Sequence, residues 1–192
     1  MLLAGGALAA CSTIQPQSRD APSQLLLADG TMISGADGWC IDQATTQTSA
    51  ETTVIVLGSC AALAGDLFQP QPNVPGVVTI SIEAEAGEVP GSEALEAFFV
   101  SEAGRAVLAR NGEADSVSII TTRHEDGLLY LHASDDSVGP NASNDIWRAL
   151  FDLGGRFVAV SFYSRDSDAI EPEDGLATLL AQVQELQAAN QG

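Results

Sequence analysis

The chain contains no lysine. Its seven basic residues are all arginine, they stand against 26 acidic residues, and the formal net charge of the 192 residues is −19. Sites built on a lysine ammonium group are excluded, including a P-loop, a Schiff-base enzyme and a kinase. The charge also argues against nucleic acid as a partner, because that binding depends on basic groups that displace counterions. Attachment to an anionic membrane through a basic face is disfavoured for the same reason.

Long hydrophobic runs are also missing. No segment after the N-terminal residues stays apolar for about 20 residues, so the sequence predicts no membrane-spanning helix. Hydrophobic residues nevertheless make up 45% of the chain, although aromatic residues make up only 5%. This aliphatic content is too high for a disordered chain. The length then predicts one globular domain, over residues 25–192.

The first eleven residues read MLLAGGALAAC. Leu8-Ala9-Ala10-Cys11 resembles the bacterial lipobox, which implies a signal remnant over residues 1–11, lipid attached to the thiol of Cys11, and removal of the residues before it. No positive charge precedes the apolar run and the run is short, so we expect translation to start upstream of Met1. The alternative is an apolar N-terminus in which Cys11 is incidental. Ser12 favours the outer membrane, because an aspartate there would be the inner-membrane retention signal.

Residues 12–24 are polar, contain two prolines and show no apolar period. They predict a flexible tether of at most about 45 Å between Cys11 and a domain that begins near Leu25. Together with the lipobox, the tether predicts a domain held at a membrane of the bacterial cell envelope and facing the periplasm.

Strands are predicted from alternation and turn residues. Residues 25–27 and 31–34 flank a turn at Asp29-Gly30. The β-branched run 53–57 is typical of a strand covered on both faces, whereas 76–83 alternates like a half-buried strand. Two hairpins follow, and their strands are 116–123 with 128–134 and 147–153 with 156–163.

Two main helices are predicted. The first runs from a Ser92 N-cap to Asn111-Gly112 and has an apolar face made of Leu95, Phe98, Phe99, Ala103, Ala106 and Val107. The second starts at Pro172 and has an apolar stripe made of Leu176, Leu179, Leu180, Val183 and Leu186. Segregated strands and helices predict an α+β fold with a mainly antiparallel sheet of about six to eight strands.

The order of elements, with the early Gly38-Trp39 strand and the closing strand and helix over 156–188, resembles the PsbP-like sandwich shared with the Ran-binding Mog family. That resemblance implies an α/β/α sandwich and a role as a lipid-anchored or soluble binding or assembly factor. No functional residue is carried over from it.

Cys40 and Cys60 are the two remaining cysteines, and in an exported protein they predict a disulfide. Closing this loop would stabilise the fold by about 3 kcal/mol. In a simple hairpin Cys60 lies beyond the register of Cys40, so the bridge requires residues 43–52 to cross over or Cys60 to fold back. The alternative is two buried thiols.

His124 and His132 are the only histidines and flank a hairpin turn. A two-residue turn places them on opposite faces of the hairpin, and a three-residue turn leaves them about 13 Å apart. Neither geometry lets both bind one metal ion. We therefore expect two solvated histidines at strand ends and no metal site.

Two acidic loops are candidates for calcium: Asp135-Asp136 through Asn141, Asn144 and Asp145, and Asp166-Asp168 through Glu171, Glu173 and Asp174. Neither has EF-hand spacing, so solvated loops are expected. Trp39, Trp147, Phe151 and Tyr163 could line a pocket, but residues of this kind more often belong to a core.

No catalytic constellation is assembled in the sequence, and no cofactor is implied. The sequence therefore favours a non-catalytic envelope module that binds a protein partner or a small ligand of unknown identity. The alternative is a hydrolase whose site combines Asp or Glu with His124 or His132. A deep pocket holding a histidine with an acidic partner would favour the enzyme.

Overall fold

A computed structural model describes residues 21–85, 87–139, 143–164 and 170–191. The elements are β1 (Gln24–Leu26), β2 (Met32–Ser34), β3 (Trp39–Ile41), β4 (Gln47–Thr48), β5 (Thr52–Ser59), α1 (Cys60–Ala64), β6 (Gly76–Glu83), α2 (Ser92–Phe99), α3 (Glu102–Leu108), the 3-10 helix η1 (Ala114–Ser116), β7 (Val117–Glu125), β8 (Leu128–Asp135), β9 (Asp145–Asp152), β10 (Phe157–Ser164) and α4 (Pro172–Ala189).

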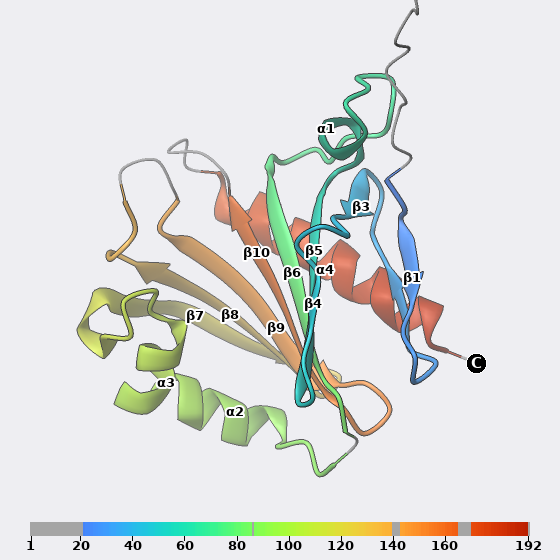
Figure 1. Cartoon of the computed structure of the whole chain (residues 1–192). Helices are drawn as coiled ribbons and strands as arrows, with labels where there is room; N and C mark the ends of the chain where they lie inside the picture. Colours follow the sequence, from blue (N-terminus) through green and yellow to red (C-terminus); the bar gives the residue numbers. More distant parts are fainter. Residues whose placement is uncertain (1–20, 86, 140–142, 165–169, 192) are drawn as a thin grey trace, which may run out of the picture.

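An eight-stranded antiparallel sheet forms the centre of the molecule. Its strand order is β3-β5-β6-β10-β9-β8-β7, with β4 also paired to β5, and β1 and β2 form a separate two-stranded sheet. Figure 1 shows α4 on one side of the large sheet and α2 and α3 on the other. The predicted α+β class with a mainly antiparallel sheet is therefore confirmed, and so are the two hairpins, β7–β8 and β9–β10.

The main core lies between α4 and the sheet. The predicted stripe of this helix is confirmed, because Leu179, Val183 and Leu186 are fully buried against residues of β6 and β10. Burial of this face is the main reason why the helix is stable, since helices are held chiefly by tertiary packing.

The opposite face carries a second core under α2 and α3, made by Leu95, Phe99 and Leu108 against the β8 and β9 residues Leu129 and Leu150. The single helix predicted over residues 92–110 is wrong. The helix is interrupted at Val100-Ser101, and the Ser101 hydroxyl accepts the N–H of Gly104 as the N-cap of α3.

Because of this interruption, α3 turns a different set of residues toward the sheet than the predicted apolar face. Val107 is 63% exposed, whereas Gly104 and Leu108 are buried. The predicted cap is also displaced, because Gly91 precedes α2 and Ser92 is its first residue. The shortened helices cover β7, β8 and β9 and leave β5, β6 and β10 without a helix on this side.

Strand β5 shows the consequence. Ile55 and Leu57 are fully buried, but Val54 and Val56 on the other face are only partly buried. The prediction that this strand is covered on both faces is therefore wrong, since only the face toward α4 is covered.

Cys40 and Cys60 form a disulfide, with their Cα atoms 4.8 Å apart. The bridge is possible because Cys60 folds back as the first residue of α1, a helix that the sequence patterns did not predict. In the β3–β5 pairing, Cys40 lies opposite Gly58, which precedes Cys60 by two residues. The backbone is tied into the domain slightly before Leu25, since Ile41 donates its N–H to the Pro22 carbonyl and β1 begins at Gln24.

Candidate functional site

The two histidines lie on opposite faces of the β7–β8 hairpin, as a two-residue turn requires. Asp126 and Gly127 form that turn with positive φ values of 48° and 81°. His124 pairs with Leu129 and His132 pairs with Thr121. The two imidazoles therefore lie in separate environments and do not form one site.

His132 is buried, so the expectation of a solvated histidine is wrong at this position. Its ring stacks on Trp147, with centroids 4.7 Å apart and planes 10° apart. Its Nε2 lies 2.8 Å from Oδ1 of Asp145. The carboxylate and the indole together fix the orientation of the ring.

A pocket of about 240 Å³ opens beside His132, between the hairpin and the first turn of α4. It is mainly apolar and is lined by Thr121, Arg123, Tyr130, Leu131, His132, Trp147, Pro172, Glu173 and Leu176. It is smaller than a typical small-molecule site. Among the described residues, the only hydrogen-bonding partner of the His132 ring is Asp145, so the geometry shows a histidine–carboxylate pair without a bonded nucleophile.

His124 joins α2 to β7. Its Nε2 lies 2.7 Å from Oε2 of Glu96, and the Thr122 hydroxyl donates to the other oxygen of that carboxylate. The hydrogen bond from Thr122 and then the one from His124 hold the pKa of Glu96 below its ordinary value. This cluster is partly exposed, and its evident role is to fasten the helix to the sheet.

The half of the sheet that α2 and α3 leave open is the second surface of interest. Across β5, β6, β10 and β9, the row Val56, Thr79, Ser161 and Arg148 lies on one face, as consecutive strand pairing requires. Val56 and Thr79 are partly buried. This surface therefore has a floor of small apolar and hydroxyl side chains with a guanidinium at one end.

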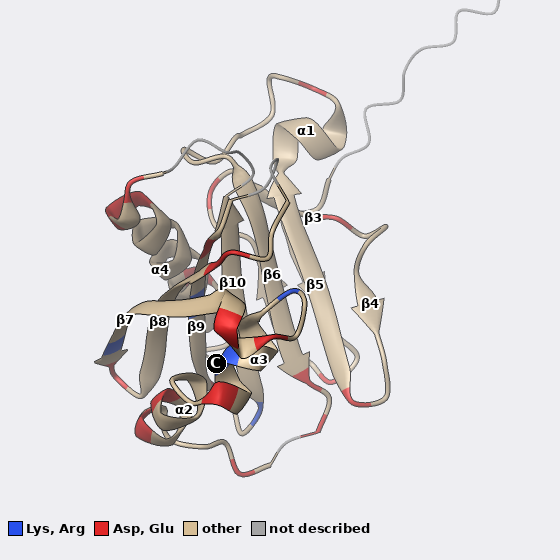
Figure 2. Cartoon of the chain, turned by 90° about the vertical axis from the view of Figure 1, so that its left-hand side faces the viewer, with Lys and Arg blue, Asp and Glu red and all other residues tan. Residues whose placement is uncertain are grey.

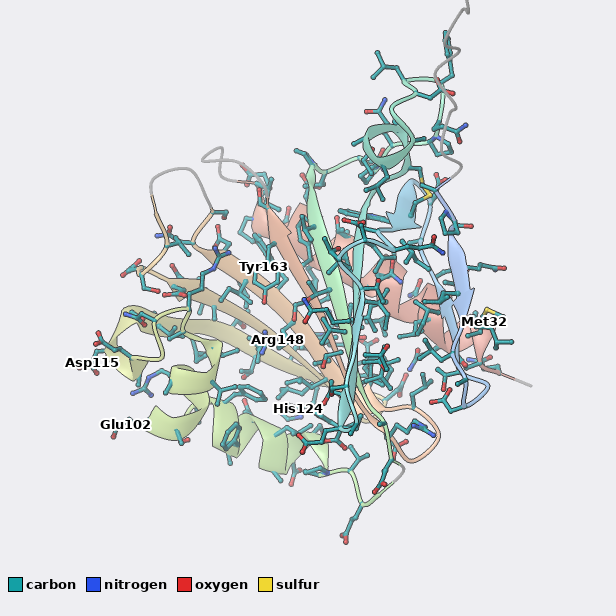
Figure 3. All side chains as sticks on the ribbon, in the orientation of Figure 1. Met32, Glu102, Asp115, His124, Arg148 and Tyr163 are labelled. Atoms are coloured by element: carbon teal, nitrogen blue, oxygen red, sulfur yellow. A yellow bond between two sulfur atoms is a disulfide. The ribbon has the colours of Figure 1, made fainter. Side chains whose placement is uncertain are left out.

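Arg148 is held by hydroxyl groups rather than by a carboxylate. Its Nε donates to Ser161 Oγ at 2.9 Å, and its Nη2 donates to Tyr163 Oη at 3.1 Å. No described carboxylate lies within ion-pairing distance of it, whereas Arg123 and Arg156 pair with Glu125 and Asp29. Figure 3 shows Arg148 and Tyr163 on the side of the sheet that carries α2 and α3.

Arg110 adds a second cation to this surface. Its guanidinium lies over the Tyr163 ring, 5.7 Å from the centroid, a cation–π geometry. Its backbone is fixed by Asp135, whose Oδ2 accepts the Arg110 N–H at 2.8 Å.

Asp135 is fully buried, so the expectation of a solvated acidic loop is wrong at this position. Burial raises the pKa of its carboxyl, but the hydrogen bonds from Ser137 and Arg110 outweigh that effect and leave the pKa below its ordinary value. The ionised carboxylate thus ties the backbone at Arg110 to the backbone at Ser137, next to the end of β8.

Arg110, Arg148, Ser161 and Tyr163 define what we call the arginine–tyrosine surface. Two of its members are cationic in a chain of net charge −19, and acidic residues are far more numerous than basic ones in Figure 2. Guanidinium groups with unused N–H donors bind carboxylates and phosphates well. The arrangement can therefore hold an anion, and it contains no group placed for proton transfer to a nucleophile.

The sequence patterns did not identify Arg148 or Arg110 as candidate binding residues. One signal was present, because Arg148 is the only charged residue in the apolar stretch Ile146–Phe151. Of the four aromatic residues considered, Trp39, Trp147 and Phe151 are core residues, and Trp147 also borders the His132 pocket. Tyr163 is partly buried on the open face.

The remaining sequence predictions fall partly outside the described residues. Cys11, its lipobox and residues 12–20 of the predicted tether do, as do residues 140–142 and 166–169 of the two acidic loops. In the parts of the chain that the structure describes, no three His, Cys, Asp or Glu side chains converge as metal ligands. The described helices also include none with the length and hydrophobicity needed to cross a membrane.

No protein-family model matches the sequence, and no curated protein matches it. Among solved structures, the chain is similar to the solution structure of cyanobacterial PsbP (CyanoP) from Synechocystis sp. PCC 6803. The TM-score is 0.45 and the identity is 11%, over 94% of this chain and 98% of that chain. No site residue or activity is taken from this similarity.

Proposed function

We propose that this protein is a lipid-anchored binding module of the bacterial cell envelope that holds an anionic ligand on its arginine–tyrosine surface without catalysing a reaction. One observation carries the binding role: Arg148 is partly buried in the middle of the sheet and is paired with two hydroxyl groups instead of a carboxylate. A buried or partly buried charge is costly unless it is compensated. A bound anion would supply the missing charge.

The proposed ligand carries a carboxylate or phosphate group next to an apolar part. The anionic group would take the free N–H donors of Arg148 and approach Arg110, while the apolar part would lie on Val56 and its neighbours. A partly apolar sheet surface without a covering helix suits a small ligand or an acidic segment of a protein partner.

Thermal unfolding of the full chain tests the binding role. Acetate, succinate and inorganic phosphate serve as probes, and a ligand at one hundred times its Kd is expected to raise the Tm by about 5–10 °C. Arg148→Gln should abolish the rise, whereas Arg123→Gln should retain it because Arg123 already pairs with Glu125. Binding of no probe, or equal rises in both variants, would contradict the proposed site.

The lipid anchor is supported by the Leu8–Cys11 sequence, which follows the lipobox pattern of a large aliphatic residue, two small residues and cysteine. Stable attachment requires more than one acyl chain. Mass spectrometry of the membrane fraction should find a mature chain that begins with acylated Cys11, and Cys11→Ser should move the protein to the soluble fraction. A mature chain with an unmodified Cys11 would contradict the anchor. Density-gradient separation of the two membranes tests the outer-membrane location that Ser12 favours.

A hydrolase remains the second candidate, because His132 and Asp145 form a pair at 2.8 Å beside an apolar pocket. The test is turnover of a panel of ester, amide and phosphate substrates. The enzyme is supported if His132→Gln removes an activity that His124→Gln retains. Absence of turnover by the wild-type chain, or equal turnover by the two variants, counts against it.

A further inference from the structure

The loop after α1 exposes two adjacent apolar side chains. Leu67 is 83% exposed and Phe68 is 98% exposed, more than any other large hydrophobic residue that the structure describes. Single exposed apolar residues are common on protein surfaces, but two neighbours this exposed at one loop tip form a contact element that has no partner within the described domain.

The loop tip is held by hydrogen bonds to backbone carbonyls and to one side-chain carboxylate. Gly65 caps the C-terminus of α1 with a left-handed φ of 66°, and the Asp66 carboxylate then accepts the N–H of Phe68 at 3.0 Å. The N–H of Asp66 returns to the Ala61 carbonyl, and the N–H of Gln69 returns to the Asp66 carbonyl. These hydrogen bonds fix the loop backbone in a conformation that leaves the side chains of Leu67 and Phe68 exposed.

The base of the tip is fixed to the sheet. Cys60, the first residue of α1, is bridged to Cys40 on β3. Ala61 donates its N–H to the Pro70 carbonyl, which closes the far side of the loop. Because the base of the loop is fixed to the sheet in this way, a surface that binds the tip would also set the orientation of the domain.

The tip lies at the end of the molecule where the described chain begins. Ala21 and Pro22 share a small hollow with Leu63 of α1, and Figure 1 shows α1 above the ends of the strands β5 and β6, near the start of the coloured chain. Nine residues lie between Cys11 and Ala21, and the ten steps along the chain reach at most about 35 Å. A membrane that holds Cys11 is therefore within reach of this end of the domain.

We infer that Leu67 and Phe68 dip into the headgroup–acyl boundary of a lipid bilayer and set the orientation of the tethered domain. This inference rests on the membrane attachment proposed above and adds a second contact to it. Residues 65–70 include Asp66 and no arginine, so the contact suits zwitterionic lipid rather than an anionic surface. In this orientation the β9–β10 turn lies at the end of the sheet away from the bilayer.

A tryptophan placed at the tip provides the test. Phe68→Trp is made in the full chain, and Val107→Trp is the matched control because Val107 is also exposed, at 63%, on α3. Both variants are coupled through Cys11, the only cysteine outside the disulfide, to a maleimide lipid in phosphatidylcholine vesicles. This chemical tether makes the test independent of whether the cell acylates Cys11. The native Trp39 and Trp147 are buried and contribute the same background.

Brominated lipids should quench the fluorescence of Phe68→Trp at least twofold more than that of Val107→Trp, and the emission of Phe68→Trp should shift to shorter wavelength. Adding phosphatidylglycerol should weaken both effects. Equal quenching of the two variants by bromolipids would overturn the inference. So would a blue shift of Phe68→Trp that depends on protein concentration without vesicles, which would assign the tip to a second copy. A blue shift without vesicles that is independent of concentration would assign it to the chain's own N-terminal residues and would also overturn it.

Discussion

Replacing Asp135 by asparagine should destabilise the protein in a pH-dependent manner. The buried carboxylate accepts three hydrogen bonds: Oδ1 from the N–H of Ser137 at 2.9 Å and from its hydroxyl at 2.6 Å, and Oδ2 from the N–H of Arg110 at 2.8 Å. All three partners are donors, so the amide nitrogen of an asparagine would face a donor on whichever side it lies. One charge-assisted bond is lost and one backbone N–H is left without an acceptor.

The cost follows from that exchange. A hydrogen bond to a charged group contributes about 1.5–3 kcal/mol, so Asp135→Asn should lower the free energy of unfolding by about 2 kcal/mol near pH 7. For a chain of this size that is a fall in Tm of roughly 4–8 °C. Asp136→Asn is the matched control, since its exposed side chain bonds only Asn144 among the described residues. It should change Tm little.

The stability difference between the wild type and Asp135→Asn should depend on pH, and its direction follows from the pKa of Asp135. Because the folded-state pKa of Asp135 is lowered, its contribution is fully present above the unfolded pKa of about 3.9 and is lost as the pH falls through the lower folded value. Urea unfolding of the wild type and the variant should therefore converge at strongly acidic pH and diverge toward neutral pH. A constant difference across the range, or equal effects of Asp135→Asn and Asp136→Asn, would refute the reasoning.

Three further changes test other parts of the fold by thermal unfolding. Replacing both Cys40 and Cys60 by serine should remove about 3 kcal/mol, because the bridge constrains the unfolded chain, and the loss should match that caused by reduction of the wild type. Gly175→Ala should cost about 1–3 kcal/mol, since the added Cβ would lie 2.3 Å from Cε2 of Trp147. Ser101→Ala should cost about 1 kcal/mol through the lost N-cap of α3.

Local sequence signals predicted the elements whose structure is determined locally. The β7–β8 and β9–β10 turns are fixed by Asp126-Gly127 and Gly154-Gly155, because these residues adopt the positive φ that a two-residue hairpin requires. The α4 stripe was predicted because its apolar period continues over several turns. For the two histidines the sequence left two turn lengths open, which place the side chains on opposite faces or on the same face because turn length sets the register. The structure adopts the two-residue turn.

Features that depend on distant packing were not predictable in this way. Whether β5 is covered on one face or on both depends on where α2 and α3 end, 40 and 49 residues after the end of β5. Burial of His132 depends on Trp147 across the strand pair. The separation of Arg148 from the described carboxylates depends on four strands that meet only in the folded sheet, so composition alone could not reveal the arginine–tyrosine surface.

The split between α2 and α3 leads to a prediction whose sign distinguishes the two descriptions of this segment. In one continuous exposed helix, Gly104→Ala would stabilise the protein by up to about 1 kcal/mol, because alanine is the better helix former. In the observed structure a Cβ on Gly104 would lie 2.0 Å from the Phe98 carbonyl oxygen and 2.5 Å from the Phe99 Cα. Both are backbone atoms, so the helices must separate, at a cost of about 1–3 kcal/mol.

Thermal unfolding of Gly104→Ala should therefore show a lower Tm, while Ala103→Gly, at the exposed neighbouring position, should cost only the propensity term of about 1 kcal/mol. A raised Tm for Gly104→Ala would mean that α2 and α3 form one helix. In that case the apolar face predicted through Val107 would be the buried one, and the helix would continue straight past the sheet. The exposure of the arginine–tyrosine surface depends on the short, broken form, so the same measurement also tests the structural basis of the proposed binding role.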